Sequence, residues 1–167
     1  MARQLWLLRH AEAEPHGVRP DSERRLTERG EQQARAAGLA LVKMDVSFDA
    51  VLFSPKARAR QTAELAAEAW SDEARERLRE YPPLAGGFDA RQAQEALADV
   101  GPEARVLLVG HEPDLSRVVA ELTGGRIDLK KGGLAVVRLE GGPTGELVVL
   151  VRPRELALIA GVPGGGH

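Results

Sequence analysis

The sequence predicts an α/β fold, a three-layer α/β/α sandwich with a mostly parallel central sheet. Three short apolar runs indicate the parallel sheet, because each run has the length and hydrophobicity of a strand that is buried on both faces. They lie at 5–8, 48–53 and 105–110. Each run is followed by a segment with helical spacing of small apolar residues, and strands that alternate with helices form parallel sheets.

The first strand, 5–8, leads directly into Arg9 and His10. In open α/β sheets, ligands bind beyond the carboxyl ends of the strands, so this charged pair lies where a functional site is expected. Residues 16–25 are polar and contain glycine and proline, which is typical of a surface loop.

The next helix is predicted to begin at Thr27, which acts as N-cap after the apolar Leu26. The spacing of the following small and apolar residues predicts one buried face. That face comprises Ala34, Ala37, Leu41 and Val42.

Ser54 and Pro55 follow the second strand and predict a helix start, because serine caps free amides and proline suits the first helical position. Arg58 lies four residues after this cap. Helical side chains lean toward the N-terminus, so Arg58 is expected to point at the mouth of the sheet. The small apolar face of this helix comprises Ala59, Thr62, Ala63, Ala66 and Ala69.

An edge strand at 76–81 and a helix at 89–100 are predicted before the third buried strand. A further helix begins near Pro113 and ends at Gly124, where glycine favours a C-cap. Its buried residues are Leu115, Val118, Val119 and Leu122.

Two apolar runs at 134–139 and 147–151, separated by a glycine and proline turn, predict a closing hairpin-like pair of strands. The length of the chain predicts one domain, which spans residues 1–163. The glycine-rich end, 164–167, is predicted to be a disordered tail.

Composition excludes several function classes. The 167 residues include no cysteine, which excludes disulfides, thiolate zinc sites and cysteine nucleophiles. A formal net charge of −2 gives no broad basic surface, so no nucleic-acid partner is expected. No apolar run approaches the roughly 20 residues that span a membrane, and strand-like sequence begins too early for a signal peptide. We therefore expect a soluble, cytoplasmic protein with no membrane partner.

Three strand-to-helix junctions carry the candidate site residues. If the strands are parallel, the junctions bring Arg9 and His10, then Arg58, then His111 and Glu112 to one edge of the sheet. Helix N-termini and arginine forks are both suited to phosphate. Nearby positive charges disfavour protonation of a histidine, so the imidazole can stay neutral and attack phosphorus. The pattern predicts a phosphate pocket that contains a nucleophilic histidine.

Three strings in the chain resemble the histidine phosphatase superfamily, whose hallmark is an Arg-His pair at the end of the first strand. They are RRLTERG at 24–30, SPKARARQT at 54–62 and GHEP at 110–113. The second string is the most specific, and the short chain looks like the SixA-type phosphohistidine phosphatases. The resemblance covers most of 5–125 and implies a phosphoglycerate-mutase-like fold that uses no cofactor.

The resemblance also implies a role for each residue of the pocket. His10 is the nucleophile that is transiently phosphorylated, and Arg9 and Arg58 hold the phosphate. His111 is a second imidazole that binds the transferring phosphoryl group and stabilises its charge.

Two positions depart from the family pattern, and the proton donor is the least defined role. Ala11 stands where the family most often has glycine, and Arg25 where proline is common. Glu112 is the first candidate for proton transfer, although its charge equally suits a helix N-terminus. Glu12 is the second candidate and is otherwise expected to be structural or to line the rim.

The interval 62–110 is filled by the predicted elements, which leaves no room for a lid. An uncovered pocket admits a phosphorylated side chain of a folded protein. The leading hypothesis is hydrolysis of protein phosphohistidine through phospho-His10. The alternatives are a phosphatase of small phosphorylated metabolites from the same superfamily and a non-catalytic phosphate-binding module. Lys130 and Lys131 are either solvated or border the pocket.

Metal chemistry is disfavoured by the residues themselves. His10 and Glu12 match the His-x-Glu of zinc deaminases, but that chemistry also needs cysteine ligands. A metal held by His10, His111 and a carboxylate would be repelled by the two arginines. We predict a metal-independent enzyme.

Overall fold

The structure, a computed structural model, describes residues 2–163, so the predicted tail at 164–167 lies outside the described residues. Six strands form one sheet in the order β3-β2-β4-β1-β5-β6. They are β1 (Arg3–Arg9), β2 (Ala50–Phe53), β3 (Leu78–Glu80), β4 (Arg105–Gly110), β5 (Leu134–Leu139) and β6 (Gly145–Val151). The first four strands pair in parallel, whereas β5 and β6 run antiparallel to their neighbours. The predicted mostly parallel sheet is confirmed.

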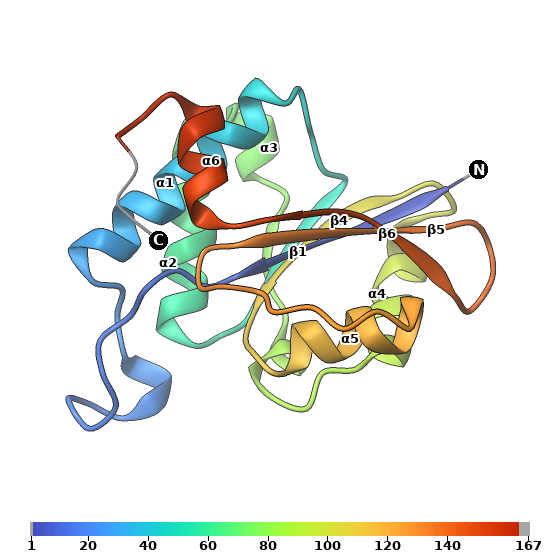
Figure 1. The fold of residues 1–167 in the computed structure, drawn as a ribbon, viewed down its shortest axis with the longest axis horizontal. Helices are drawn as coiled ribbons and strands as arrows, with labels where there is room; N and C mark the ends of the chain where they lie inside the picture. Colours follow the sequence, from blue (N-terminus) through green and yellow to red (C-terminus); the bar gives the residue numbers. More distant parts are fainter. Residues whose placement is uncertain (1, 164–167) are drawn as a thin grey trace.

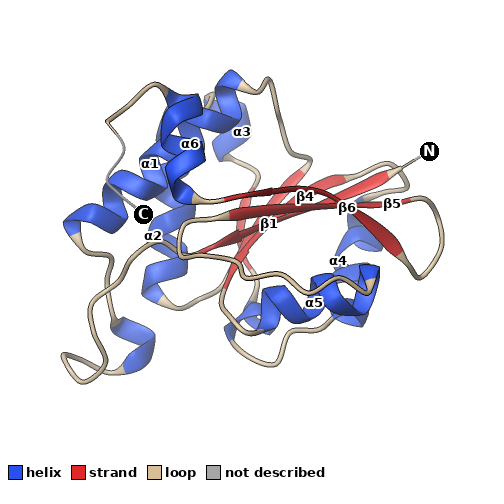
Figure 2. Ribbon diagram, viewed as in Figure 1, coloured by secondary structure: helices blue, strands red, loops and turns tan. Residues whose placement is uncertain are grey.

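Helices cover both faces of the sheet and complete the three predicted layers (Figures 1 and 2). One face carries α1 (Glu28–Lys43), α2 (Ala57–Ala66), the single turn α3 (Asp72–Arg75) and α6 (Pro153–Ala160). The other face carries α4 (Ala90–Val100) and α5 (Asp114–Thr123). Short 3-10 turns are η1 (Asp21–Glu23), η2 (Ala67–Ala69) and η3 (Pro82–Ala85). None of the helices within residues 2–163 combines the length and apolar content needed to cross a membrane.

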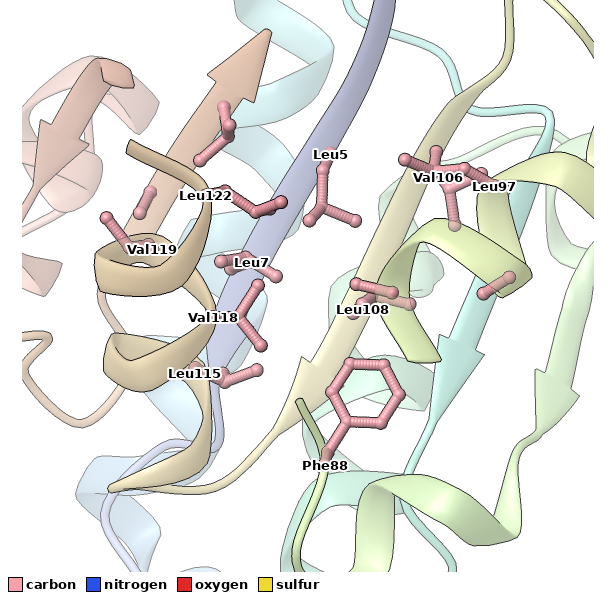
Figure 3. Packing of buried hydrophobic residues seen from close by; sticks show 14 of the residues in the cluster. Leu5, Leu7, Phe88, Leu97, Val106, Leu108, Leu115, Val118, Val119 and Leu122 are labelled. Atoms are coloured by element: carbon pink, nitrogen blue, oxygen red, sulfur yellow. The ribbon is translucent and has the colours of Figure 1, made fainter. Parts of the chain in front are cut away.

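Strand β1 explains why an unbroken apolar run forms the centre of this sheet. Successive side chains of a strand point to opposite faces. Leu5 and Leu7 therefore pack on the side of α4 and α5 (Figure 3), whereas Trp6 and Leu8 pack on the side of α1 and α6. All four are buried, and burying one such side chain contributes about 2 kcal/mol. Both layers of helices thus depend on this strand.

The register of the parallel strands places the candidate site. Arg9 at the end of β1 is level with Gly110 at the end of β4. Phe53 at the end of β2 is level with the residue just before Gly110. The residues that follow these three strands therefore meet at one edge of the sheet, as the sequence predicts.

Helix α1 begins as predicted, with the Thr27 hydroxyl accepting a hydrogen bond from the amide of Gly30 at 3.0 Å. Its predicted face is correct for Ala34, Ala37 and Leu41, which are buried. It is wrong for Val42, which is 44% exposed because it lies about 100° around the helix from Leu41.

The start of α2 differs from the prediction. The helix begins at Ala57 with Lys56 as N-cap, and no side chain caps its amides. Ser54 lies outside the helix, and its hydroxyl accepts a hydrogen bond from the Lys56 amide at 3.2 Å. Ala69 is exposed in η2, because the α-helix ends at Ala66.

The sequence prediction omits α6, which follows β6 directly. Pro153 in its first turn and the buried Leu156, Ala157 and Ala160 are the signals that would have identified it. The helix packs on α1, and the Lys43 ammonium donates to the carbonyl of Ala160 at 2.8 Å.

Candidate active site

A cavity of about 320 Å³ opens at the carboxyl edge of the sheet. Its lining comes from the ends of β1 and β4, from the first turn of α2, and from the long segment that joins β1 to α1 (Figure 1). The lining residues are Arg9, His10, Ala13, Glu14, Pro15, His16, Asp21, Arg24, Arg58, His111, Glu112 and Lys131. The structure thus brings together five of the six residues singled out in the sequence.

His10 lies at the end of β1 and is 6% exposed. Its Nδ1 atom lies 2.8 Å from the carbonyl oxygen of Ala11. A carbonyl oxygen only accepts hydrogen bonds, so Nδ1 carries the proton and Nε2 keeps a lone pair. Burial, and then the charges of Arg58 and Arg9, lower the pKa of His10 to about 3. Desolvation is therefore the larger cause that keeps the His10 imidazole neutral. The positive charges of Arg58 and Arg9, which the sequence argument invoked, are the smaller cause.

Ala11 anchors the turn that carries His10. Its amide donates to the hydroxyl of Thr62 at 3.0 Å, and that hydroxyl donates to the carbonyl of Arg58 at 2.7 Å. The methyl group of Ala11 is fully buried against Leu26 and Ala34. The alanine fills an apolar contact between this turn and α1, and the turn still joins the nucleophile segment to α2.

His111 follows β4 and faces His10, with the two ring centroids 5.3 Å apart. Its Nε2 atom lies 2.7 Å from the hydroxyl of Ser54, while its Nδ1 atom is buried without a partner among the described residues. Burial, and then the proximity of His10 and Arg58, lower the pKa of His111 to about 3. Both imidazoles are therefore neutral at pH 7.

Arg9 and Arg58 are each held by a backbone carbonyl. The Nη1 of Arg9 donates to the carbonyl of Leu129 at 2.9 Å, and the Nη1 of Arg58 donates to that of Asp21 at 2.7 Å. The Nε of each guanidinium is buried and has no partner among residues 2–163. Each arginine is thus fixed in place at the wall of the cavity, where a guanidinium group is suited to an oxyanion.

Asp21 and Arg24 also line the cavity. The sequence reasoning did not name Asp21, and it included Arg24 in a family string without giving it a role in the site. Arg24 is 8% exposed and donates to the Asp21 carboxylate from Nε at 3.1 Å and from Nη2 at 3.0 Å. Lys56 and Arg58 each lie 3.3 Å from the same carboxylate. Desolvation raises the pKa of Asp21, but the hydrogen bond from Arg24 and the charge of Arg58 outweigh it and hold that pKa well below its usual range. Asp21 is therefore a fixed negative charge beside Arg58.

The two carboxylates considered as proton donors lie in different places. Glu112 lines the cavity, and its carboxylate accepts from both the amide and the hydroxyl of Ser116 in α5. Glu12 does not line it. The Glu12 carboxylate instead accepts from the hydroxyl of Thr27 at 2.7 Å and lies 3.7 Å from Arg29. Of the two, only Glu112 thus lines the cavity, and both of its carboxylate oxygens accept from Ser116.

Lys131 borders the cavity, one of the two placements considered for it from the sequence. The turn that carries it is held against the end of β1, because the amide of Gly132 donates to the carbonyls of Arg9 and His10 at 3.1 and 3.0 Å. This contact joins the start of β5 to the histidine.

Comparison with known proteins identifies the family. The sequence pattern of the histidine phosphatase superfamily (branch 1) matches residues 5–86. An uncharacterized protein of Picosynechococcus sp. is 30% identical over 169 residues, which cover 92% of this chain and 98% of that protein. The chain belongs to the histidine phosphatase superfamily.

Two solved structures resemble this superfamily member over nearly their whole lengths. The protein histidine phosphatase SixA complexed with tungstate is 28% identical, with a TM-score of 0.79 over 92% of this chain and 99% of that chain. A structure described as a SixA phosphohistidine phosphatase from Nakamurella multipartitia is 28% identical to this chain. The two structures align with a TM-score of 0.75 over 92% of this chain and 97% of that chain. The predicted resemblance to the superfamily and its fold is confirmed.

The superfamily match covers only part of the cavity. His10, Arg9, Arg58, Asp21 and Arg24 lie within the matched residues 5–86. The residues contributed by β4 and by the turn before β5 lie beyond them, and the sheet register brings them to the same edge. Within 2–163, no group of three or more histidine, aspartate and glutamate side chains has the arrangement of a metal site.

Proposed function

We propose that this superfamily member is a phosphatase that removes the phosphoryl group from phosphohistidine on a protein, through a covalent phospho-His10 intermediate. The observation that carries the proposal is the hydrogen bond from His10 Nδ1 to the carbonyl of Ala11. It leaves Nε2 as a neutral nucleophile in a cavity with Arg9 and Arg58.

The proposed first step transfers the phosphoryl group to the enzyme. Nε2 of His10 forms a bond to phosphorus while the N–P bond of the substrate breaks. The guanidinium groups of Arg9 and Arg58, which line the cavity, bind the phosphoryl oxygens, and His111 contributes a further hydrogen bond. The departing substrate imidazole leaves as a neutral ring after it takes up a proton.

In the second step, water attacks the phosphorus of phospho-His10. The N–P bond breaks, inorganic phosphate leaves, and Nε2 regains its lone pair. Glu112 is the proposed carrier of protons in both steps, because it lines the same cavity as the two histidines, whereas Glu12 does not. Imidazole is protonated easily, so the substrate's leaving group needs little help from an acid.

Two observations favour a protein substrate. No residue between Arg58 and His111 lines the cavity, so the segment from α2 to β4 supplies no cover over it. The similar SixA structure is described as a protein histidine phosphatase and holds tungstate, which is a tetrahedral oxyanion like phosphate. A phosphoimidazole on the surface of a folded domain fits an uncovered site of this kind.

The test is phosphate release from a histidine-phosphorylated protein, compared with a panel of sugar and nucleotide phosphates. We expect the phosphoprotein to be preferred, and His10→Asn to abolish turnover without lowering the unfolding midpoint of the protein. A wide preference for a small phosphate ester would favour the metabolite phosphatase instead. Stoichiometric binding of phosphate with no turnover would indicate a phosphate-binding module.

A chelator provides a separate check of the proposed chemistry. We expect EDTA to leave phosphate release unchanged, because every proposed contact to the phosphoryl group comes from a protein nitrogen. Loss of activity that a divalent cation restores would contradict the metal-independent mechanism.

A further inference from the structure

A second cavity, of about 260 Å³, adjoins the first one and is called the basic cavity below. Its lining residues are Arg9, Glu12, Arg29, Gln33, Lys130 and Lys131. Arg9 and Lys131 line both cavities, so the basic cavity continues the candidate active site along the same edge of the sheet.

The basic cavity concentrates positive charge in a chain whose net charge is −2. Four of its lining side chains are cationic and one is a carboxylate. Lys130 is paired with Asp128 at 2.6 Å, but the nearest approach of Arg29 to Glu12 is a loose 3.7 Å. Lys131 has no carboxylate within 4 Å among the described residues. The cavity therefore retains unneutralised charge.

One residue of the basic cavity also has a donor without a partner. The Nε of Arg29 is buried and has no hydrogen-bond partner within residues 2–163, whereas the guanidinium of Arg9 is assigned to the phosphoryl group. A buried donor without a partner costs free energy, which an incoming acceptor recovers. An anion that entered here would meet the guanidinium group of Arg29 and the ammonium groups of Lys130 and Lys131.

The backbone holds these side chains in position. The start of α1 lies so close to the end of β1 that a Cβ atom on Gly30 would lie 1.9 Å from the carbonyl oxygen of Glu12. On the other side, the amide of Gly133 donates to the carbonyl of Lys130 at 2.8 Å and closes a tight turn. Arg29 and Lys130 therefore come from two segments with fixed backbones, and both line the same cavity as Arg9.

We propose that the basic cavity binds an acidic side chain of the substrate polypeptide, a few residues from the phosphohistidine. The inference rests on the proposed function and narrows its substrate to phosphohistidine in an acidic sequence context. A guanidinium fork matches a carboxylate in charge and shape. Each residue of extended chain spans about 3.4 Å, so a neighbour of the phosphorylated residue reaches an adjoining cavity.

The experiment uses two synthetic phosphohistidine peptides that differ only in flanking residues, Glu-Glu in one and Gln-Gln in the other. The measured quantity is the ratio of kcat/KM for phosphate release from the two peptides. We expect the wild-type enzyme to prefer the acidic peptide by about fivefold at low salt, a size typical of two exposed ion pairs. The preference should shrink at 0.5 M salt, because the contacts are screened.

Arg29→Gln/Lys130→Gln is the test variant. It removes two cationic groups and leaves the carboxylate of Asp128 without its lysine partner, so the preference ratio should fall to about one although Lys131 remains. The matched control is Arg91→Gln/Arg138→Gln, which removes the same charge elsewhere. Arg138 pairs in register with Gln4 at the far end of β1, and Arg91 lies beside Arg3. The control variant should keep the wild-type ratio.

The outcomes separate this inference from the proposed function. Hydrolysis of both peptides at equal rates by the wild type, or a preference that survives in the test variant, would overturn the acidic-context proposal alone. If the wild-type enzyme hydrolyses neither of the two peptides, both the acidic-context proposal and the proposed function are overturned. A third substrate, a small ester with two phosphoryl groups, gives the last comparison. The wild-type enzyme could prefer this ester over the matching ester with one phosphoryl group and show no preference for the Glu-Glu peptide. If the test variant then loses the preference for the ester, the ligand of the basic cavity is a second phosphate and the proposal is wrong.

Discussion

The Nε2 atom of His111 lies 2.7 Å from the Oγ atom of Ser54, and both side chains are buried. The Ser54 hydroxyl already accepts from the amide of Lys56, and His111 is its only acceptor among the described residues. Donation from Ser54 to Nε2 places the proton of His111 on Nδ1, the nitrogen that is buried without a partner. Ser54 thereby turns His111 into a hydrogen-bond donor inside the cavity.

Ser54→Ala should therefore lower kcat about tenfold with little change in KM, because His111 loses the contact that sets its tautomer. The buried ring nitrogen is left without a partner, so the free energy of unfolding should also fall, by about 1–3 kcal/mol. Steady-state kinetics and urea denaturation measure the two effects. Ser71→Ala, which removes the N-cap of the remote α3, is the control for stability alone. An unchanged kcat would show that Ser54 has no part in positioning the imidazole.

The two buried histidines predict acid sensitivity of the fold. The pKa values of His10 and His111 fall from 6.5 to about 3 on folding, so the unfolded chain binds more protons at every pH between these values. The free energy of unfolding should therefore decrease as the pH falls from 6.5 toward 3, by up to about 1.4 kcal/mol per pH unit for each histidine. Between pH 6.5 and 5 most carboxylates stay ionised, so urea denaturation in this window isolates the histidines. His10→Asn should roughly halve the slope, and a slope unaffected by that change would contradict the assignment.

The fixed charge of Asp21 predicts a change in phosphate affinity. Asp21 lies 3.3 Å from Arg58 and offsets part of the positive charge that an incoming phosphate meets. Asp21→Asn should tighten competitive inhibition by inorganic phosphate about threefold, the scale expected for removing one screened charge near the site. It should also lower kcat, because Arg58 loses an ion pair that holds its guanidinium. Glu23→Gln removes an exposed charge from the same turn and is the matched control, for which we expect the inhibition constant to stay near the wild-type value.

The sequence predicted those parts of the molecule that depend on local periodicity. The unbroken apolar run from Leu5 to Leu8 predicts a strand covered on both faces, and the order of strands and helices predicts that the junctions meet at one edge. His10 and its partners could be identified because each follows directly on a buried strand or opens a helix. Their positions are thus consequences of the backbone topology.

The sequence could not predict contacts made by residues outside any periodic pattern. Asp21 lies in a polar segment that resembles any surface loop, and Arg24 lies in a family string that assigns it no role. Only the tertiary structure places both at the cavity, where Arg24 and Arg58 contact the same Asp21 carboxylate. The sequence predicts Ser54 to be a helix cap, because it does not reveal that the hydroxyl also has a hydrogen-bond partner in His111. Such side-chain contacts depend on long-range packing, which a local pattern does not encode.

The close contact between α1 and α2 provides the last prediction. A Cβ atom on Gly38 of α1 would lie 1.8 Å from the carbonyl oxygen of Ala66, and the Gly38 carbonyl accepts from the indole of Trp70 at 3.1 Å. Gly38→Ala adds helix propensity worth about 1 kcal/mol, but the methyl group would force the two helices apart. We expect a net loss of about 2 kcal/mol or more in the free energy of unfolding, measured by urea denaturation.

Gly86→Ala is the matched control for that substitution, because a Cβ atom there has no neighbour within 4 Å and the backbone is extended. It should change the free energy of unfolding by less than about 0.5 kcal/mol. Because α2 carries Arg58 at its start, Gly38→Ala should also weaken inhibition by inorganic phosphate. A stable Gly38→Ala protein with unchanged phosphate affinity would mean that the two helices can separate without moving the site.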